Sequence, residues 1–92
     1  MMKAFTDIEQ SKKLAEILPI ESADMCFNDN EPSWSLAALL EIIPEVLVER
    51  RIPNAWDCVS YAECQMTSAN NFENLIDACV EVILKLHKQK FL

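Results

Sequence analysis

Residues 45–64 read EVLVERRIPNAWDCVSYAEC, and this stretch decides between the two fold classes that the chain allows. From Trp56 to Cys64, the sequence fits the two-residue period of a β-strand, where successive residues point to opposite faces. One face carries Trp56, Cys58, Ser60, Ala62 and Cys64, and the other carries Asp57, Val59, Tyr61 and Glu63.

The run EVLVER, residues 45–50, has the composition of a shorter strand. The segment RIPNA joins the two runs and contains Pro53-Asn54, a pair suited to a turn. The stretch therefore predicts an antiparallel hairpin. Because an isolated hairpin is marginal in water, we expect helices to cover one of its faces.

A first helix is predicted upstream of the hairpin, between Thr6 and Pro19. Thr6 and Glu9 have the spacing of a capping box, and Pro19 pushes the residue before it out of helical geometry. The predicted apolar face consists of Ile8, Leu14, Ala15 and Leu18.

A second helix is predicted in WSLAALLEII, residues 34–43, with Ser33 as its cap and Pro44 as its end. Because its alanines at positions 37 and 38 are small, they allow close packing.

The third helix follows the hairpin and has the clearest pattern. Asn70 and Glu73 form its expected cap pair. Glu81 and Lys85 are an i, i+4 pair on its polar face. Its apolar stripe consists of Phe72, Ile76, Cys79, Val80, Ile83 and His87. The predicted order is α-α-β-β-α, a small α+β domain over residues 1–92 in which helices pack on one face of a short antiparallel hairpin or sheet. The alternative is an all-α fold in which EVLVER is helical.

Length, composition and charge exclude several classes of protein. The 92 residues suffice for one modest core, and 51% hydrophobic residues argue against a disordered chain. No apolar run approaches the ~20 residues of a membrane span, and the N-terminus does not resemble a signal peptide. We therefore expect a cytoplasmic protein without membrane contact.

The net charge of −7 is unevenly distributed along the chain. Between Leu14 and Glu49 there are eight acids and no base, which argues against nucleic-acid binding because phosphates would be repelled. The simplest interpretation of the acids is a solvated surface.

Residue usage also limits the chemistry. Without glycine the chain has no P-loop, dinucleotide-binding turn or nucleophile elbow. The four cysteines include no C-x-x-C, and with His87 as the single histidine they form no zinc pattern. A secreted protein cross-linked by disulfides would agree with the number of cysteines alone. Free thiols in the core agree with the cytoplasmic location that we expect. We expect no cofactor and no metal.

An enzyme built from these residues would have to use His87 as its base. Its nucleophile would be Cys26, Cys58, Cys64 or Ser22. Because a packed histidine is the commoner occurrence near the end of such a helix, we expect that the protein is not an enzyme.

Residues 18–25, LPIESADM, begin the long irregular stretch from Pro19 to Pro32. Its acids lack the spacing and the glycine of a calcium loop. We expect Ser22 and Asp24 to accept hydrogen bonds in a turn, and Leu18, Ile20 and Met25 to be buried. A role in binding is the alternative.

Four residues are candidates for contact with a partner protein: Asp24, Trp34, Trp56 and Tyr61. Large amphipathic side chains are frequent anchors in interfaces when they are exposed. The alternative for the aromatic residues is packing in the core and on the sheet.

Three stretches carry a resemblance: FTDIEQSKKLAEILPIESADM (5–25), PSWSLAALLEIIP (32–44) and NLIDACVEVILKLHKQKFL (74–92). Together they resemble a family of small uncharacterised proteins of Bacteroides-type gut bacteria, often found in prophage-like or mobile-element contexts. The resemblance covers both ends of the chain and is weakest over residues 45–71. It implies a bacterial cytoplasmic protein, and no activity, cofactor or site residue.

The leading functional hypothesis is a non-enzymatic interaction or accessory protein that binds an unknown protein or itself. A sharper version is an acidic mimic of DNA that inhibits a DNA-binding protein, motivated by the base-free run from Leu14 to Glu49. The third hypothesis is the cysteine- and histidine-dependent enzyme.

Overall fold

The computed structural model describes residues 4–26, 31–52, 55–62, 65–90 and 92, without the side chain of the residue at position 51. The elements are α1 (Ile8–Ile17), the 3-10 turn η1 (Ile20–Ser22), β1 (Met25–Cys26), β2 (Pro32–Ser33), α2 (Leu36–Ile42), β3 (Val46–Ile52), β4 (Ala55–Ser60), β5 (Thr67–Phe72) and α3 (Leu75–Lys88). The α+β class is confirmed.

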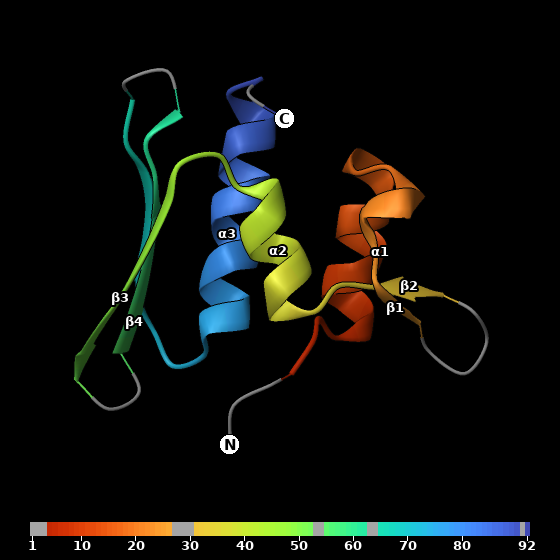
Figure 1. Ribbon diagram of the computed structural model, residues 1–92, viewed down its shortest axis with the longest axis horizontal. Coiled ribbons are helices and arrows are strands. Elements are labelled where there is room, and N and C mark those ends of the chain that lie inside the picture. Colours follow the sequence, from red (N-terminus) through yellow and green to blue (C-terminus); the bar gives the residue numbers. More distant parts are fainter. Residues whose placement is uncertain (1–3, 27–30, 53–54, 63–64, 91) are drawn as a thin grey trace.

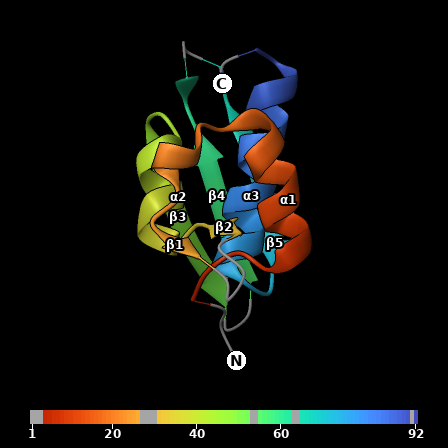
Figure 2. The same cartoon turned by 90° about the vertical axis from the view of Figure 1, so that its right-hand side faces the viewer.

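The elements form layers around α3 (Figure 1). On one side of α3 lies an antiparallel sheet in the order β3-β4-β5, and on the other side lies α1 with the small β1-β2 pair. Helix α2 packs beside α3, as the view in Figure 2 also shows. All three helices thus lie on the same side of the sheet, and no described element covers its other face.

The hairpin predicted from residues 45–64 is confirmed. Strands β3 and β4 pair in antiparallel register, with Leu47 opposite Val59 and Val48 opposite Cys58. The predicted turn residues Pro53 and Asn54 lie outside the described residues, as do Glu63 and Cys64.

Strand β5 was not predicted, and it changes the start of α3. Asn70 and Phe72 belong to β5, where Trp56 lies opposite Phe72. The true N-cap is Asn74, whose side chain accepts a hydrogen bond from the amide of Ile76 at 2.9 Å. The cap pair Asn70–Glu73 and the place of Phe72 on the helix were therefore wrong.

The caps of α1 and α2 lie one and two residues further along the chain than predicted. Asp7 and Gln10 form the capping box of α1, in place of Thr6 and Glu9. Ser35 caps α2, whereas Ser33 lies in β2, where its buried hydroxyl has no hydrogen-bond partner in the described part of the chain.

Helix α1 buries less apolar surface than its pattern predicts. Leu14 and Leu18 are in the core, but Ile8 and Ala15 are exposed. The buried side of the helix instead holds a pair of hydroxyls, Thr6 Oγ1 and Ser11 Oγ, 2.8 Å apart. Because Thr6 Oγ1 also accepts from the amide of Trp34 at 3.1 Å, this pair joins the N-terminal segment to the start of α2.

The core is built mainly on α3. Leu75, Ile76, Ala78, Cys79, Val80, Val82, Ile83 and Leu86 are all buried. His87 is exposed rather than part of this stripe, and its Nδ1 lies 3.0 Å from the carbonyl oxygen of Leu92.

Non-glycine residues occupy the left-handed backbone region at three described positions, Glu45, Asn71 and Lys90. Asn71 has φ 64° and lies in the β-bulge that interrupts the pairing of β4 with β5. Its amide donates to Asp57 Oδ1 at 3.0 Å. Asparagine tolerates this region better than most residues, which suits a chain without glycine.

Candidate functional site

The segment LPIESADM holds the first turn of α2 in place. Ser22 Oγ donates to the carbonyl of Pro19 at 2.6 Å and accepts from the indole Nε1 of Trp34 at 2.9 Å. Asp24 accepts from both the backbone amide (2.8 Å) and the hydroxyl of Ser35. Both polar residues thus bind the residues that open α2, which favours the structural interpretation of this segment.

The apolar residues of that segment differ from the prediction. Leu18 is buried as expected, but Ile20 and Met25 are exposed. Because η1 and β1 lie at the periphery of the molecule, their side chains have little to pack against (Figure 1).

Asp24 therefore has a defined electrostatic role. Hydrogen bonds from the hydroxyl and the amide of Ser35 lower the pKa of its carboxyl below the usual value. A lowered pKa in the folded state gives stability that is present above pH 4 and lost as the pH falls through the folded-state pKa.

We predict that Asp24→Ala lowers the free energy of unfolding by about 1 kcal/mol at pH 7, the typical net contribution of a hydrogen bond, because the bonds from Ser35 are lost. Urea unfolding at pH 7, 4 and 2.5 measures the effect. The difference from the parent protein should shrink as the pH falls through the folded-state pKa, because the parent carboxyl then becomes protonated. A difference that is constant with pH would contradict this role.

Trp34 lies inside the fold, whereas Trp56 is only half-buried. Trp34 is 0% exposed, so no partner can contact its side chain in the folded protein. Trp56 is half-buried against the core on the helix-facing side of the sheet, and the guanidinium carbon of Arg50 lies 5.6 Å from its ring centroid.

Tyr61 lies on the opposite side of the sheet. Cys58 faces α3, because its sulfur lies 3.8 Å from that of Cys79. Since strand neighbours alternate, Val59 points away from the helices. Tyr61 directly follows the end of β4, and its amide still donates to the carbonyl of Glu45 at 3.2 Å, so we infer that it continues the same alternation. Leu47 and Ser68 lie directly opposite Val59 on the flanking strands and share its face.

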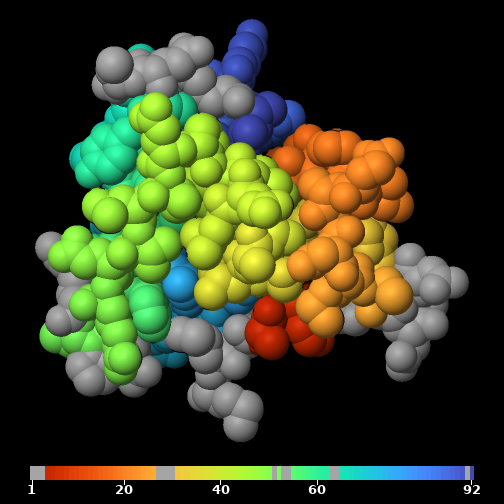
Figure 3. All heavy atoms as spheres, in the orientation of Figure 1, coloured from red at the N-terminus to blue at the C-terminus, as the bar shows by residue number. Residues whose placement is uncertain are grey.

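These four residues, Leu47, Val59, Tyr61 and Ser68, define what we term the outer sheet face. Leu47 is 49% exposed and Tyr61 is 42% exposed, while Val59 and Ser68 are half-buried by their neighbours. Glu49 is exposed two residues after Leu47 on β3, which is an edge strand. Side chains of β3 lie at the margin of the molecule beside α2 in Figure 3.

Among the described residues, no hydrogen bond joins His87 to Ser22 or to a cysteine: His87 Nδ1 lies near the carbonyl oxygen of Leu92, and Ser22 Oγ binds Pro19 and Trp34. His87 is exposed near the chain end, whereas Cys58 and Cys79 are buried in the core. Cys26 is exposed on β1, and Cys64 lies outside the described residues. Across the described residues, no group of three or more His, Cys, Asp or Glu side chains is arranged to hold a metal ion.

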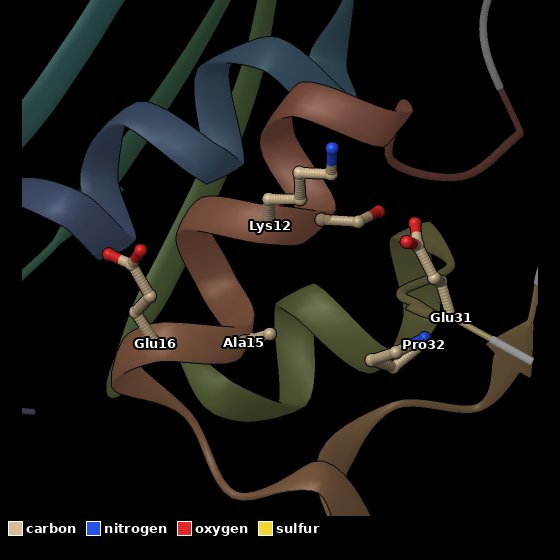
Figure 4. Close-up of a pocket in the computed structure, with 6 residues that line it drawn as sticks. Lys12, Ala15, Glu16, Glu31 and Pro32 are labelled. Carbon is tan, nitrogen blue, oxygen red and sulfur yellow. The ribbon is translucent and has the colours of Figure 1, made fainter.

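The surface depressions also lack a catalytic arrangement. One of about 340 Å³ lies between α1 and β2 and is lined by Lys12, Glu16 and Glu31 together with Ser11, Ala15 and Pro32 (Figure 4). The hydroxyl of Ser11 is already hydrogen-bonded to Thr6. A second, of about 430 Å³, is lined by Glu21, Ser22, Asp24 and Glu41 together with Ala23, Ala37, Ala38 and Ile42. The hydroxyl of Ser22 already donates to the carbonyl of Pro19 and accepts from the indole of Trp34. In neither depression does a described nucleophilic side chain form a hydrogen bond with a histidine base.

Comparison of the chain with models of protein families, with curated proteins and with solved structures found no match. None of the described helices has the length and apolarity needed to cross a membrane.

Proposed function

We propose that this protein is a non-enzymatic interaction protein that binds a protein partner through the outer sheet face. The observation that supports the proposal is the one-sided covering of the sheet, which leaves Leu47, Val59 and Tyr61 as neighbouring apolar side chains on the uncovered face. An apolar cluster with an aromatic residue is typical of the centre of an interface.

Charge indicates the chemistry of that partner. The chain has a net charge of −7, and Glu49 is exposed beside the apolar cluster. A partner with an apolar patch flanked by lysine or arginine would complement this surface. Two copies of this chain would instead repel each other, so the proposal favours a different protein over self-association.

The DNA-mimic hypothesis receives less support. Exposed acids occur on α1 (Glu9, Glu16), η1 (Glu21), α2 (Glu41) and β3 (Glu49), and also at Asp7, Asp24, Glu45 and Glu73 between the elements. Helix α1 and strand β3 lie at opposite sides of the molecule, with α2 between them (Figure 1). This distribution does not favour a single row of phosphate-like charges. The cytoplasm is the proposed location, because free cysteines such as Cys26, Cys58 and Cys79 are typical of reducing compartments.

We predict that Leu47→Glu reduces partner binding at least tenfold while the protein stays folded. A carboxylate at this half-exposed position costs little in the free protein but would be desolvated in an apolar interface. The measurement is affinity purification of the tagged protein from its natural host, with quantitative mass spectrometry.

The matched control is Ile20→Glu, since Ile20 is 65% exposed on η1, on the far side of the molecule. A specific partner should be retained by this control and lost by Leu47→Glu, and its capture should weaken at high salt. A partner lost only with Ile20→Glu, or bound equally by both variants, would overturn the proposal.

A further inference from the structure

Two buried thiols meet at the contact between the sheet and α3. Cys58 on β4 and Cys79 on α3 are both 0% exposed, and the thiol of Cys79 donates to the sulfur of Cys58 at 3.8 Å. To form a disulfide, this separation must shorten by about 1.8 Å to the ~2.05 Å of an S–S bond. The side chain of Cys58 on β4 and that of Cys79 on α3 can each contribute part of this movement.

We propose that Cys58 and Cys79 form a reversible disulfide by exchange with a small-molecule disulfide such as oxidised glutathione, cross-linking β4 to α3. This inference is independent of the outer sheet face, because it concerns the opposite face of the sheet. It assigns a redox-sensitive site to residues that pack as ordinary core thiols when reduced.

The exchange is balanced without any further reactant. One cysteine thiolate attacks a sulfur of oxidised glutathione and releases one glutathione, giving a mixed disulfide. The second cysteine then attacks the protein sulfur of that mixed disulfide and releases the other glutathione. Two protein thiols are oxidised to one disulfide, one glutathione disulfide is reduced to two thiols, and the two protons pass to the released glutathiones.

In the closed fold the hydrogen bond makes the two thiols unequal. By donating to Cys58, the thiol of Cys79 lowers the pKa of Cys58, whereas the bond and burial raise the pKa of Cys79. This difference is lost when α3 separates from β4, so either sulfur can attack first and the other completes the bond.

Burial sets the rate of this exchange. Because neither sulfur is exposed, glutathione reaches them only when α3 separates from β4. Oxidation is thus expected to be slow in the native protein and faster at urea concentrations below the unfolding transition. Once formed, the bond is enclosed again, so its reduction by glutathione requires the same separation and is slow as well.

The first experiment incubates the reduced wild-type protein with millimolar oxidised and reduced glutathione and follows its mass. A parallel sample carries Cys26→Ser and Cys64→Ser, which leave only the proposed pair of thiols. We expect a loss of about 2 Da and a peptide that links residues 58 and 79, consistent with one disulfide. The oxidised two-thiol protein should melt about 10 °C or more above its reduced form.

Controls separate this outcome from non-specific oxidation. Cys79→Ala and Cys58→Ala, made in the same two-serine background, should gain glutathione or stay reduced without losing 2 Da. Circular dichroism verifies that each variant is folded. Alanine is chosen because it leaves no unpaired polar group in the core.

Two results would overturn the inference. In one, the folded two-thiol protein stays reduced while Cys26 of the wild type takes up glutathione in the same buffer. In the other, a disulfide made in the urea-unfolded chain is lost when the protein refolds in that buffer, because the native packing then opposes the bond.

Discussion

Replacing Trp34 by alanine is expected to lower the free energy of unfolding by about 3–5 kcal/mol, the usual effect of removing a large buried aromatic side chain. Trp34 is the largest fully buried side chain among the described residues. A domain of this size is stable by about 5–15 kcal/mol, so the variant would lose a large share of its stability.

The loss has two sources at Trp34. The first is the cavity left by the indole ring, and the second is the hydrogen bond from its Nε1 to Ser22 Oγ, at 2.9 Å. Trp34→Phe separates them, because phenylalanine fills much of the volume but cannot donate. It should cost about 1–2 kcal/mol.

Urea unfolding followed by far-ultraviolet circular dichroism measures both variants, since tryptophan fluorescence is itself altered. If Trp34→Ala costs less than about 1 kcal/mol, Trp34 is not an anchor of the core. Equal losses for alanine and phenylalanine would assign the whole effect to the hydrogen bond.

The second large effect is expected at Asp57, on the uncovered side of the sheet. Asp57→Ala should lower the free energy of unfolding by about 2 kcal/mol, because a nearly buried carboxylate that accepts from the amide of Asn71 is removed. That hydrogen bond holds the bulge that lets β5 continue pairing with β4.

Asn71→Gly is the matched control for this prediction. Glycine keeps the amide that donates to Asp57 and adopts the φ of 64° readily, so the change should stay within about 1 kcal/mol. Urea unfolding gives both values, and hydrogen exchange of the residue 71 amide reports the bond itself. An Asp57→Ala variant as stable as the control would contradict the role given to the carboxylate.

The hairpin and α3 could be predicted because their patterns are local. Alternation in β4 and the apolar stripe of α3 both reflect one buried face, which sequence periodicity records directly. Strand β5, with the sequence TSANNF, has no such alternation, because its bulge shifts the side chains and its pairing with β4 is tertiary. Asn70 and Glu73 therefore resembled a helix cap pair.

The N-cap of α1 could not be predicted for a different reason. Thr6–Glu9 and Asp7–Gln10 are equally good capping pairs by sequence. The choice is made by Trp34, since its amide donates to Thr6 Oγ1 and holds that hydroxyl in the core. Such a contact joins residues 28 positions apart, so no local pattern could reveal it.

Among the candidate partner-binding residues, Tyr61 was found from the sequence and belongs to the outer sheet face. Leu47 was missed, although the alternation of Val46, Leu47 and Val48 in EVLVER already placed it on one face with Glu49. The missing information was which face the helices cover, and the contact of Cys58 with Cys79 supplies it.

Site-specific photo-crosslinking in living host cells tests whether a partner protein binds to the outer sheet face. A photoreactive phenylalanine analogue replaces Leu47 or Tyr61 in one set of cells and Ile20 or Ile8, which are exposed outside the sheet, in another. Our account predicts that both sheet positions crosslink the same protein and that the two control positions do not. Crosslinks to that protein only from Ile20 or Ile8, or no crosslinked product from either sheet position, would contradict a docking role for the outer sheet face.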